Sequence, residues 1–253
     1  MDECPSNVPD RESLIVSVRF LTLAAASVAL LAPTVPPTAP GQPGKGHLLR
    51  HQPTAVQHEG AVSAAELLAR VRDCAPVSAG RYRTDGGTPA TVPVCGTPDA
   101  VFWQADMDID CDGRPGDRCN SSTDPYFSAG TAFQQSDGRH LDAETLPYVV
   151  VPVPSAVWDH RDHGVRGGSV VAVVHGDRVQ YAVVGDTGPH DIIGEASYAT
   201  AQALGINPDP KGGGTDSGVT YIVFKDSQAV PIESHASAVQ IGERLARGFV
   251  DGS

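Results

Sequence analysis

Four runs of apolar residues constrain the fold more strongly than any other feature of the sequence. They are almost continuous in Val and Ile and occupy residues 148–153, 169–174, 179–184 and 219–224. β-branched residues favour strands, and strands that lack polar alternation are typically buried on both faces. Gly176 and Asp177 lie between the second and third runs, which predicts a β-hairpin there. We therefore expect a small closed β-barrel.

Three helices are expected to flank these strands. Ser63 and Glu66 have the spacing of a capping box, which predicts a helix that continues through Arg72. A second helix is expected over residues 196–204, where Gly205 provides the C-cap, and an amphipathic third over about 234–249. The predicted fold class is mainly β with flanking helices, in one domain over residues 61–253.

The N-terminal segment has the composition of an export signal. Residues 20–32 are apolar or small and are too short to span a membrane, and a Pro-rich stretch follows them. We expect residues 1–42 to be a signal peptide with a Pro-rich start, and residues 43–60 to be a disordered linker. No other segment is apolar enough to cross a membrane, so we expect a secreted, extracellular protein.

The cysteine pattern agrees with export. Downstream of Cys4 the chain has an even set of four cysteines, at positions 74, 95, 111 and 119. In an exported protein such a set indicates disulfides, and the pairs Cys74–Cys95 and Cys111–Cys119 would each close a short loop. A zinc site is the alternative, but the chain has no C-x-x-C pair to support it.

The net charge limits the class of partner. The 253 residues carry 30 acidic and 18 basic side chains, which gives a formal charge of −12 at pH 7. Nucleic acid binding requires a positive surface, so we exclude it. An acidic surface attracts cations or a cationic polymer instead.

Residues 185–197 carry the strongest candidate for catalysis. This segment joins the third strand run to the second helix and contains two acids, Asp186 and Glu195, together with Gly185, Gly188 and Gly194. Two carboxyl groups held close together by a tight turn suit general acid and base chemistry. The alternative is an ordinary corner of the fold with two solvated acids.

A second acidic segment lies at residues 106–113. In an extended conformation its alternating acids would share one face, namely Asp106, Asp108, Asp110 and Asp112. The spacing resembles a calcium loop, but the Gly at position six and the Glu at position twelve are missing. A metal site, a solvated ridge and the wall of a cleft for a cationic ligand all remain open.

Two other motifs carry less weight. Asp186-Thr187-Gly188 and Asp216-Ser217-Gly218 resemble the triplets of aspartic proteases, but they are too close in sequence to belong to two similar lobes. The Gly-rich segment 211–215 lacks the spacing of a phosphate-binding loop.

Taken together, several segments resemble family 75 of the glycoside hydrolases, the chitosanases. They are 106–113 (DMDIDCDG), 141–152 (LDAETLPYVVVP), 168–174 (GSVVAVV), 185–197 (GDTGPHDIIGEAS) and 207–224. The resemblance covers about residues 65–250. It implies a secreted endo-acting enzyme that cleaves β-1,4-linked glucosamine polymers with inversion, with Asp186 and Glu195 as the catalytic carboxylates. The D-T-G…I-x-G corner at residues 186–194 is also similar to that of double-psi β-barrel enzymes, and by this analogy we expect a six-stranded barrel.

This resemblance leads to specific expectations about the site. In an inverting enzyme the two carboxyl groups stand roughly 6.5–9.5 Å apart, and we favour Glu195 as the acid and Asp186 as the base. Asp108 and Asp110 are expected to bind the cationic substrate, chitosan. We expect a monomer and assign no cofactor and no metal. A related glycosidase acting on chitin or peptidoglycan, and a non-catalytic polysaccharide-binding barrel, are the alternatives.

Overall fold

A computed structural model describes residues 59–252 of the chain. The predicted signal peptide and almost all of the predicted linker lie outside these residues. Glu59 and Gly60, the last two residues of the predicted linker, are described. Glu59 makes two hydrogen bonds to the third predicted strand run. Its N–H donates to the carbonyl of Val179, and its Oε2 accepts the N–H of Tyr181.

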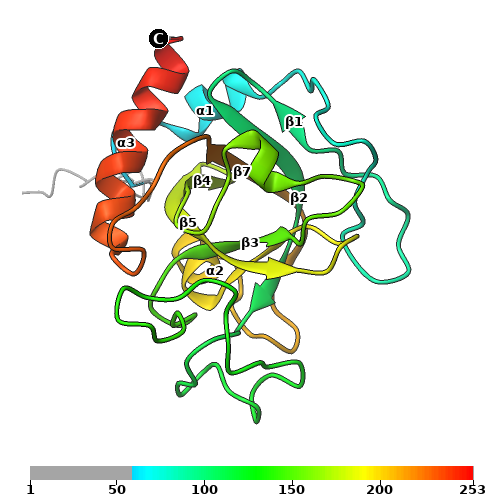
Figure 1. The fold of residues 1–253 in the computed structure, drawn as a ribbon, viewed down its shortest axis with the longest axis vertical. Helices are drawn as coiled ribbons and strands as arrows, with labels where there is room; N and C mark the ends of the chain where they lie inside the picture. Colours follow the sequence, from blue (N-terminus) through cyan, green and yellow to red (C-terminus); the bar gives the residue numbers. More distant parts are fainter. Residues whose placement is uncertain (1–58, 253) are drawn as a thin grey trace, which may run out of the picture. The chain divides into compact units, whose positions relative to one another are not determined.

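The described residues form a mainly β domain with three α-helices, as expected (Figure 1). The strands are β1 (Cys95–Gly96), β2 (Ala100–Asp110), β3 (Tyr148–Pro152), β4 (Val170–His175), β5 (Arg178–Gly188), β6 (Glu195–Ser197) and β7 (Thr215–Phe224). The helices are α1 (Ala64–Arg70), α2 (Tyr198–Leu204) and α3 (His235–Asp251), with a short 3-10 turn η1 (His160–His163).

Six of the strands close into a barrel, which confirms the predicted architecture. The order is β2-β6-β3-β5-β4-β7, and β7 pairs with β2 to close the ring, while β1 adds to the outer edge of β2. The pairs β2–β6 and β3–β5 are parallel, and the predicted β4–β5 hairpin turns at Gly176 and Asp177. All four predicted strand runs are strands of this barrel.

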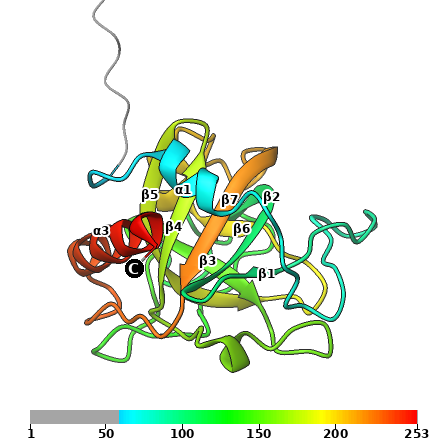
Figure 2. The ribbon, with the colours of Figure 1, turned by 90° about the horizontal axis from the view of Figure 1, so that it is seen from above.

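The continuous apolar runs are explained by burial on both faces. In β4, Val171 and Val173 belong to the cluster that fills the barrel, together with Trp103 and Tyr221. The intervening residues of β4 belong to a second cluster, which also contains Phe249 of α3. Figures 1 and 2 show α3 beside β4 and β5, with α1 next to it. The outer face is therefore covered by helices.

The local signals for the helices are also confirmed. Ser63 and Glu66 form the capping box of α1, which ends at Arg70 rather than Arg72. Gly205 ends α2 in the left-handed conformation that glycine favours. None of the helices in residues 59–252 is long and apolar enough to cross a membrane.

Both predicted disulfides are present. Cys74 bonds to Cys95 on β1, and Cys111, directly after β2, bonds to Cys119. The second bond anchors the start of the long connection between β2 and β3, residues 111–147. In Figure 1 this connection lies on the β3 side of the barrel.

Candidate active site

An acidic cleft lies where β2, β5 and β6 meet the long connection. Its volume is about 350 Å³. Five of its lining residues are acids, namely Asp110, Asp112, Asp124, Asp186 and Glu195. The remaining lining residues are Ile109, Cys111, Tyr126, Val150, Thr187, Gly188 and Pro189. The two acids of residues 185–197 therefore share one cavity, together with part of the second acidic segment.

Asp186 is held in a defined orientation by two backbone amides. It lies in β5, which is longer than the apolar run predicted, and it is buried. The N–H groups of Ala132 and Thr187 each donate a hydrogen bond of 2.7 Å to its Oδ1. Burial raises the pKa of Asp186, and the two amide bonds and His140 act against this rise.

Glu195 is the first residue of β6. The helix that was predicted from residue 196 begins instead at Tyr198 and is capped by Ser197. Strand β6 pairs in parallel with the end of β2, where Asp108 is the register partner of Glu195. The carboxyl group is thus fixed by the sheet.

The environment of Glu195 favours its protonated form. Among the described residues no hydrogen bond reaches either oxygen of its carboxyl group. Burial, followed by the negative charges of Asp108, Asp112 and Asp186, raises the pKa of Glu195 to about 7. Gly188 permits close approach here, because a Cβ atom at that position would lie 2.6 Å from Oε2 of Glu195.

Asp110 and Asp112 extend the acidic character of the cleft. Oδ1 of Asp110 accepts the N–H of Asp112, and Oδ1 of Asp112 accepts the N–H of Ser128. Burial is the main cause that raises the pKa of Asp110 well above its usual range and that of Asp112 to about 6. One carboxylate oxygen each of Asp110, Asp112 and Asp186 lies within 4.8 Å of the others.

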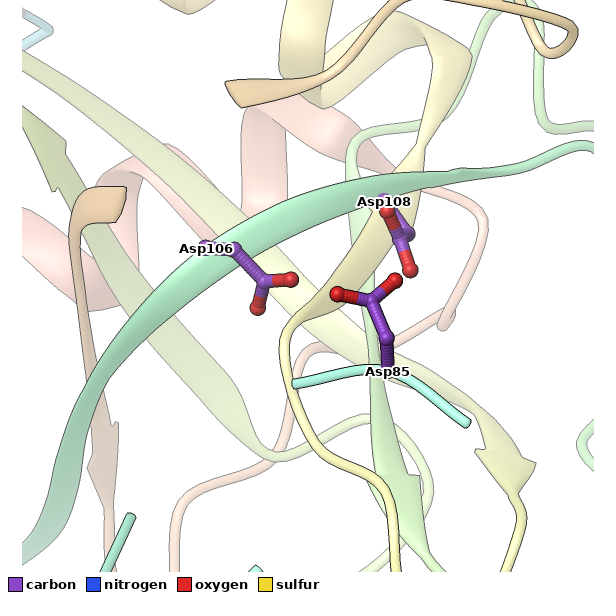
Figure 3. Close-up of side chains that lie close together, drawn as sticks. All are labelled: Asp85, Asp106 and Asp108. Carbon is purple, nitrogen blue, oxygen red and sulfur yellow. The ribbon is translucent and has the colours of Figure 1, made fainter. Parts of the chain in front are cut away.

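The four acids of the segment 106–113 divide into two groups in the structure. A register irregularity between Ala105 and Met107 interrupts the pairing of β2 with β7. Asp110 and Asp112 line the cleft, whereas Asp106 and Asp108 do not. They group instead with Asp85, which lies on a loop 21 residues before Asp106 (Figure 3). Of the two predicted substrate-binding residues, only Asp110 contacts this cavity.

Sequence reasoning missed three contributors to the site. Asp124 and Tyr126 come from the long connection, and Tyr126 is 91% exposed at the cleft. The amide of Ala132, which orients Asp186, comes from the same connection. The sequence signal for Tyr126 was an aromatic residue beside an acid and a proline in a turn-rich loop, at Asp124-Pro125-Tyr126. A backbone amide carries no signal in its side chain.

The arrangement has the chemistry of one class of enzyme. Glycoside hydrolases use two carboxyl groups in one cleft, one protonated and one ionised. Here Glu195 has the environment of the protonated partner, and Asp186 has two amide donors that stabilise the ionised form. A closed barrel with such a cleft therefore points to the hydrolases that act on glycosidic bonds.

Comparison with known proteins identifies the family. Residues 107–245 match the family described as "Fungal chitosanase of glycosyl hydrolase group 75". An endo-chitosanase of Aspergillus oryzae is 32% identical over 167 residues, which cover 57% of this chain and 68% of that protein. Endo-chitosanase B of the same species is 34% identical over 162 residues, which cover 56% of this chain and 67% of that protein. An endo-chitosanase of Aspergillus fumigatus is 32% identical over 180 residues, which cover 61% of this chain and 76% of that protein. The chain belongs to glycosyl hydrolase group 75.

Proposed function

We propose that the protein is a secreted endo-chitosanase that hydrolyses β-1,4 linkages between glucosamine units with inversion of the anomeric configuration. The observation that carries this proposal is the pair Asp186 and Glu195, two carboxyl groups with different environments in one acidic cleft. The catalytic domain spans residues 61–253 and works as a monomer on chitosan, without a nucleic acid or membrane partner.

Glu195 serves as the general acid. Its pKa of about 7 keeps a large share of the carboxyl groups protonated in mildly acidic and neutral medium. A protonated Glu195 donates its proton to the oxygen of the leaving sugar as the glycosidic bond breaks. Its burial and the negative charges of the neighbouring acids hold that proton until substrate arrives.

Asp186 serves as the general base. Its Oδ1 accepts two amide bonds, which fix the carboxylate plane and leave Oδ2 as the atom for a water molecule. The ionised group takes a proton from this water as the water attacks the anomeric carbon from the face opposite the leaving group. Attack from that face inverts the configuration, and the product forms without a covalent enzyme intermediate.

The remaining acids of the cleft favour an amino sugar. Chitosan carries free amines that are partly protonated in mildly acidic medium. Asp110, Asp112 and Asp124 line the same cavity as the catalytic pair. A cleft with this charge raises the local concentration of the polymer and pairs with its ammonium groups, whereas neutral or N-acetylated glycans gain nothing from it. We assign Asp110 to ammonium binding, since an approaching ammonium group acts against the raised pKa of Asp110 and favours its ionised form.

Two observations support secretion. The described residues contain two disulfides, which persist in oxidising compartments. The apolar segment 20–32, outside the described residues, has the length of a signal-peptide core.

Product analysis tests the reaction. Chitosans of graded acetylation are incubated with the protein, with chitin, peptidoglycan and a neutral β-glucan as controls, and the fresh products are followed by proton NMR. We expect short glucosamine oligomers whose new reducing ends are first in the α configuration. Cleavage of chitin or peptidoglycan in preference to chitosan would identify a related wall glycosidase. Binding without any cleavage would identify a non-catalytic barrel.

Two substitutions test the residues. Glu195→Gln and Asp186→Asn should each lower kcat by roughly 10²–10⁴-fold, the usual contribution of a positioned acid or base. Azide should restore part of the activity of Asp186→Asn only, because it replaces the activated water. Asp191→Asn is the matched control, since Asp191 lies in the same connection but does not line the cleft and is paired with Arg83. Wild-type turnover in either catalytic variant would refute the assignment.

A further inference from the structure

Three acids outside the catalytic cleft form a separate cluster. Asp106 and Asp108 lie on β2. Asp85 lies on the loop between Tyr82 and Val92, two residues that pair in an isolated β-bridge. Figure 3 shows the three carboxyl groups turned toward one another, with Asp85 opposite the strand. One oxygen from each lies within 4.8 Å of the other two. Asp85 and Asp108 are exposed, so the cluster is open to solvent on one side.

Asp106 provides a second and independent observation. Its side chain is only 4% exposed, and its buried Oδ1 atom has no hydrogen-bond partner among the described residues. That oxygen lies against the backbone of Gly194, where a Cβ atom would come within 2.0 Å of it. Burying a carboxylate without a donor is costly, so this oxygen requires a positive partner or a proton.

No protein cation supplies that partner. Within residues 59–252, none of the salt bridges involves Asp85, Asp106 or Asp108. The nearest arginine in sequence, Arg83, is used elsewhere: its Nε contacts Asp191 and its Nη1 donates to the carbonyl of Thr88. The charges that act on Asp106 come from other acids. The cluster is therefore uncompensated by side chains.

We propose that Asp85, Asp106 and Asp108 form a calcium site beside the catalytic cleft. Calcium binds oxygen ligands at about 2.3–2.6 Å, so oxygens on opposite sides of one ion are roughly 4.6–5.2 Å apart. A spacing within 4.8 Å allows all three carboxylates to reach one ion. Water from the open side completes the coordination, and calcium tolerates the irregular geometry better than magnesium does.

The site would link the loop that carries Asp85 to strand β2. Asp85 belongs to a loop whose neighbouring residue Arg83 bridges to Ile192, and Asp108 is the register partner of Glu195. An ion bound by Asp85 and β2 therefore secures this loop against the strand that supports Glu195. Its role is positional, and it is distinct from the acids that line the cleft.

Calcium binding to the full protein tests the proposal without any substrate. After treatment with EDTA and removal of the chelator, the protein is titrated with CaCl₂ in a calorimeter. We expect one ion per chain with a Kd of about 10⁻⁴–10⁻³ M, the range of open extracellular sites. Calcium at about 10 mM should raise Tm by roughly 3–5 °C, and magnesium should do so less.

Asp85→Asn is the decisive variant, because Asp85 is exposed and its loss leaves the core intact. It should weaken calcium binding at least about 10-fold and abolish the rise in Tm. Asp112→Asn, in the other acidic cluster, should keep both. The proposal is overturned if the wild-type protein binds no calcium at about 10 mM. In that case a proton on Asp106, and not a metal ion, satisfies its buried carboxyl group. The proposal is also overturned if Asp85→Asn binds as wild type does, or if only Asp112→Asn loses binding.

Discussion

The backbone N–H of Ala132 donates a 2.7 Å hydrogen bond to Oδ1 of Asp186, across 54 residues of sequence. Thr187 donates a second bond to the same oxygen, whereas no donor reaches Glu195 among the described residues. Burial raises the pKa of both carboxyl groups, but only that of Asp186 is opposed by amide donors. Of these two carboxyl groups, Glu195 therefore has the environment that favours the protonated form, as its proposed role as general acid requires.

The pH dependence of activity should follow from this difference. A general acid works only when protonated, so kcat/KM should fall as pH rises through the pKa of Glu195, about 7. In Asp112→Asn a negative charge near Glu195 is removed, which lowers the pKa of Glu195. The alkaline limb of the pH profile should then move to lower pH. Initial rates from about pH 4 to about pH 9 measure this limb.

Asp177→Asn is the control for the pH experiment. Asp177 lies at the turn of the β4–β5 hairpin, is exposed, and does not contribute to the pKa of Glu195. Its profile should match that of wild type. An alkaline limb that stays in place in Asp112→Asn would show that another group controls it.

Local signals were sufficient for much of the fold. The hairpin at Gly176 and Asp177, the capping box at Ser63 and Glu66, and burial of the Val-rich runs on both faces were all predicted, because each depends on neighbouring residues. The strand β6 was not predicted. Its three residues pair in parallel with β2, about 90 positions earlier, and a parallel pair leaves no local turn signal.

The candidate site was predictable to a similar extent. Asp186 and Glu195 lie in one short segment, so their proximity could be inferred from glycine-rich turns. The amide of Ala132 and the loop residue Asp85 could not be inferred in this way. Ala132 lies on the long connection, 54 residues before Asp186, and Asp85 joins its separate cluster from a loop outside the barrel strands, so no local pattern indicates either contact.

Tyr126 should contribute to substrate binding. Its ring is 91% exposed and borders the cleft, where the apolar face of a sugar ring can lie against it. Tyr126→Ala should raise KM by roughly 2–10-fold with little change in kcat, since contacts of aromatic rings are worth about 0.5–1.5 kcal/mol. Tyr126→Phe should retain most of the affinity. Equal losses in both variants would indicate that the hydroxyl group matters rather than the ring.

Salt should weaken the recognition of chitosan through the acids of the cleft. Asp124→Asn removes one negative charge but keeps an oxygen that can accept the N–H of Tyr126. Asp124 is buried in the protein but lines the open cleft. At low ionic strength this variant should raise KM by roughly 2–5-fold, about the effect of losing one ion pair at a protein surface. The difference from wild type should shrink as NaCl screens the charge. A KM that is unchanged at low salt would exclude Asp124 from binding.

Gly188→Ala tests whether the position of Glu195 controls turnover. A Cβ atom at residue 188 would lie 2.6 Å from Oε2 of Glu195 and 3.0 Å from Cγ1 of Val150. The end of the glutamate side chain is flexible, so its carboxyl group should move rather than the strand. Because catalysis depends steeply on the placement of the reacting groups, kcat should fall by roughly 10–100-fold while the fold persists. Circular dichroism and kinetics on the same sample separate a loss of fold from a loss of turnover.

Gly212→Ala is the control, because no atom lies within 4 Å of its added Cβ. Full activity in Gly188→Ala would mean that Glu195 tolerates displacement, which is incompatible with a fixed general acid.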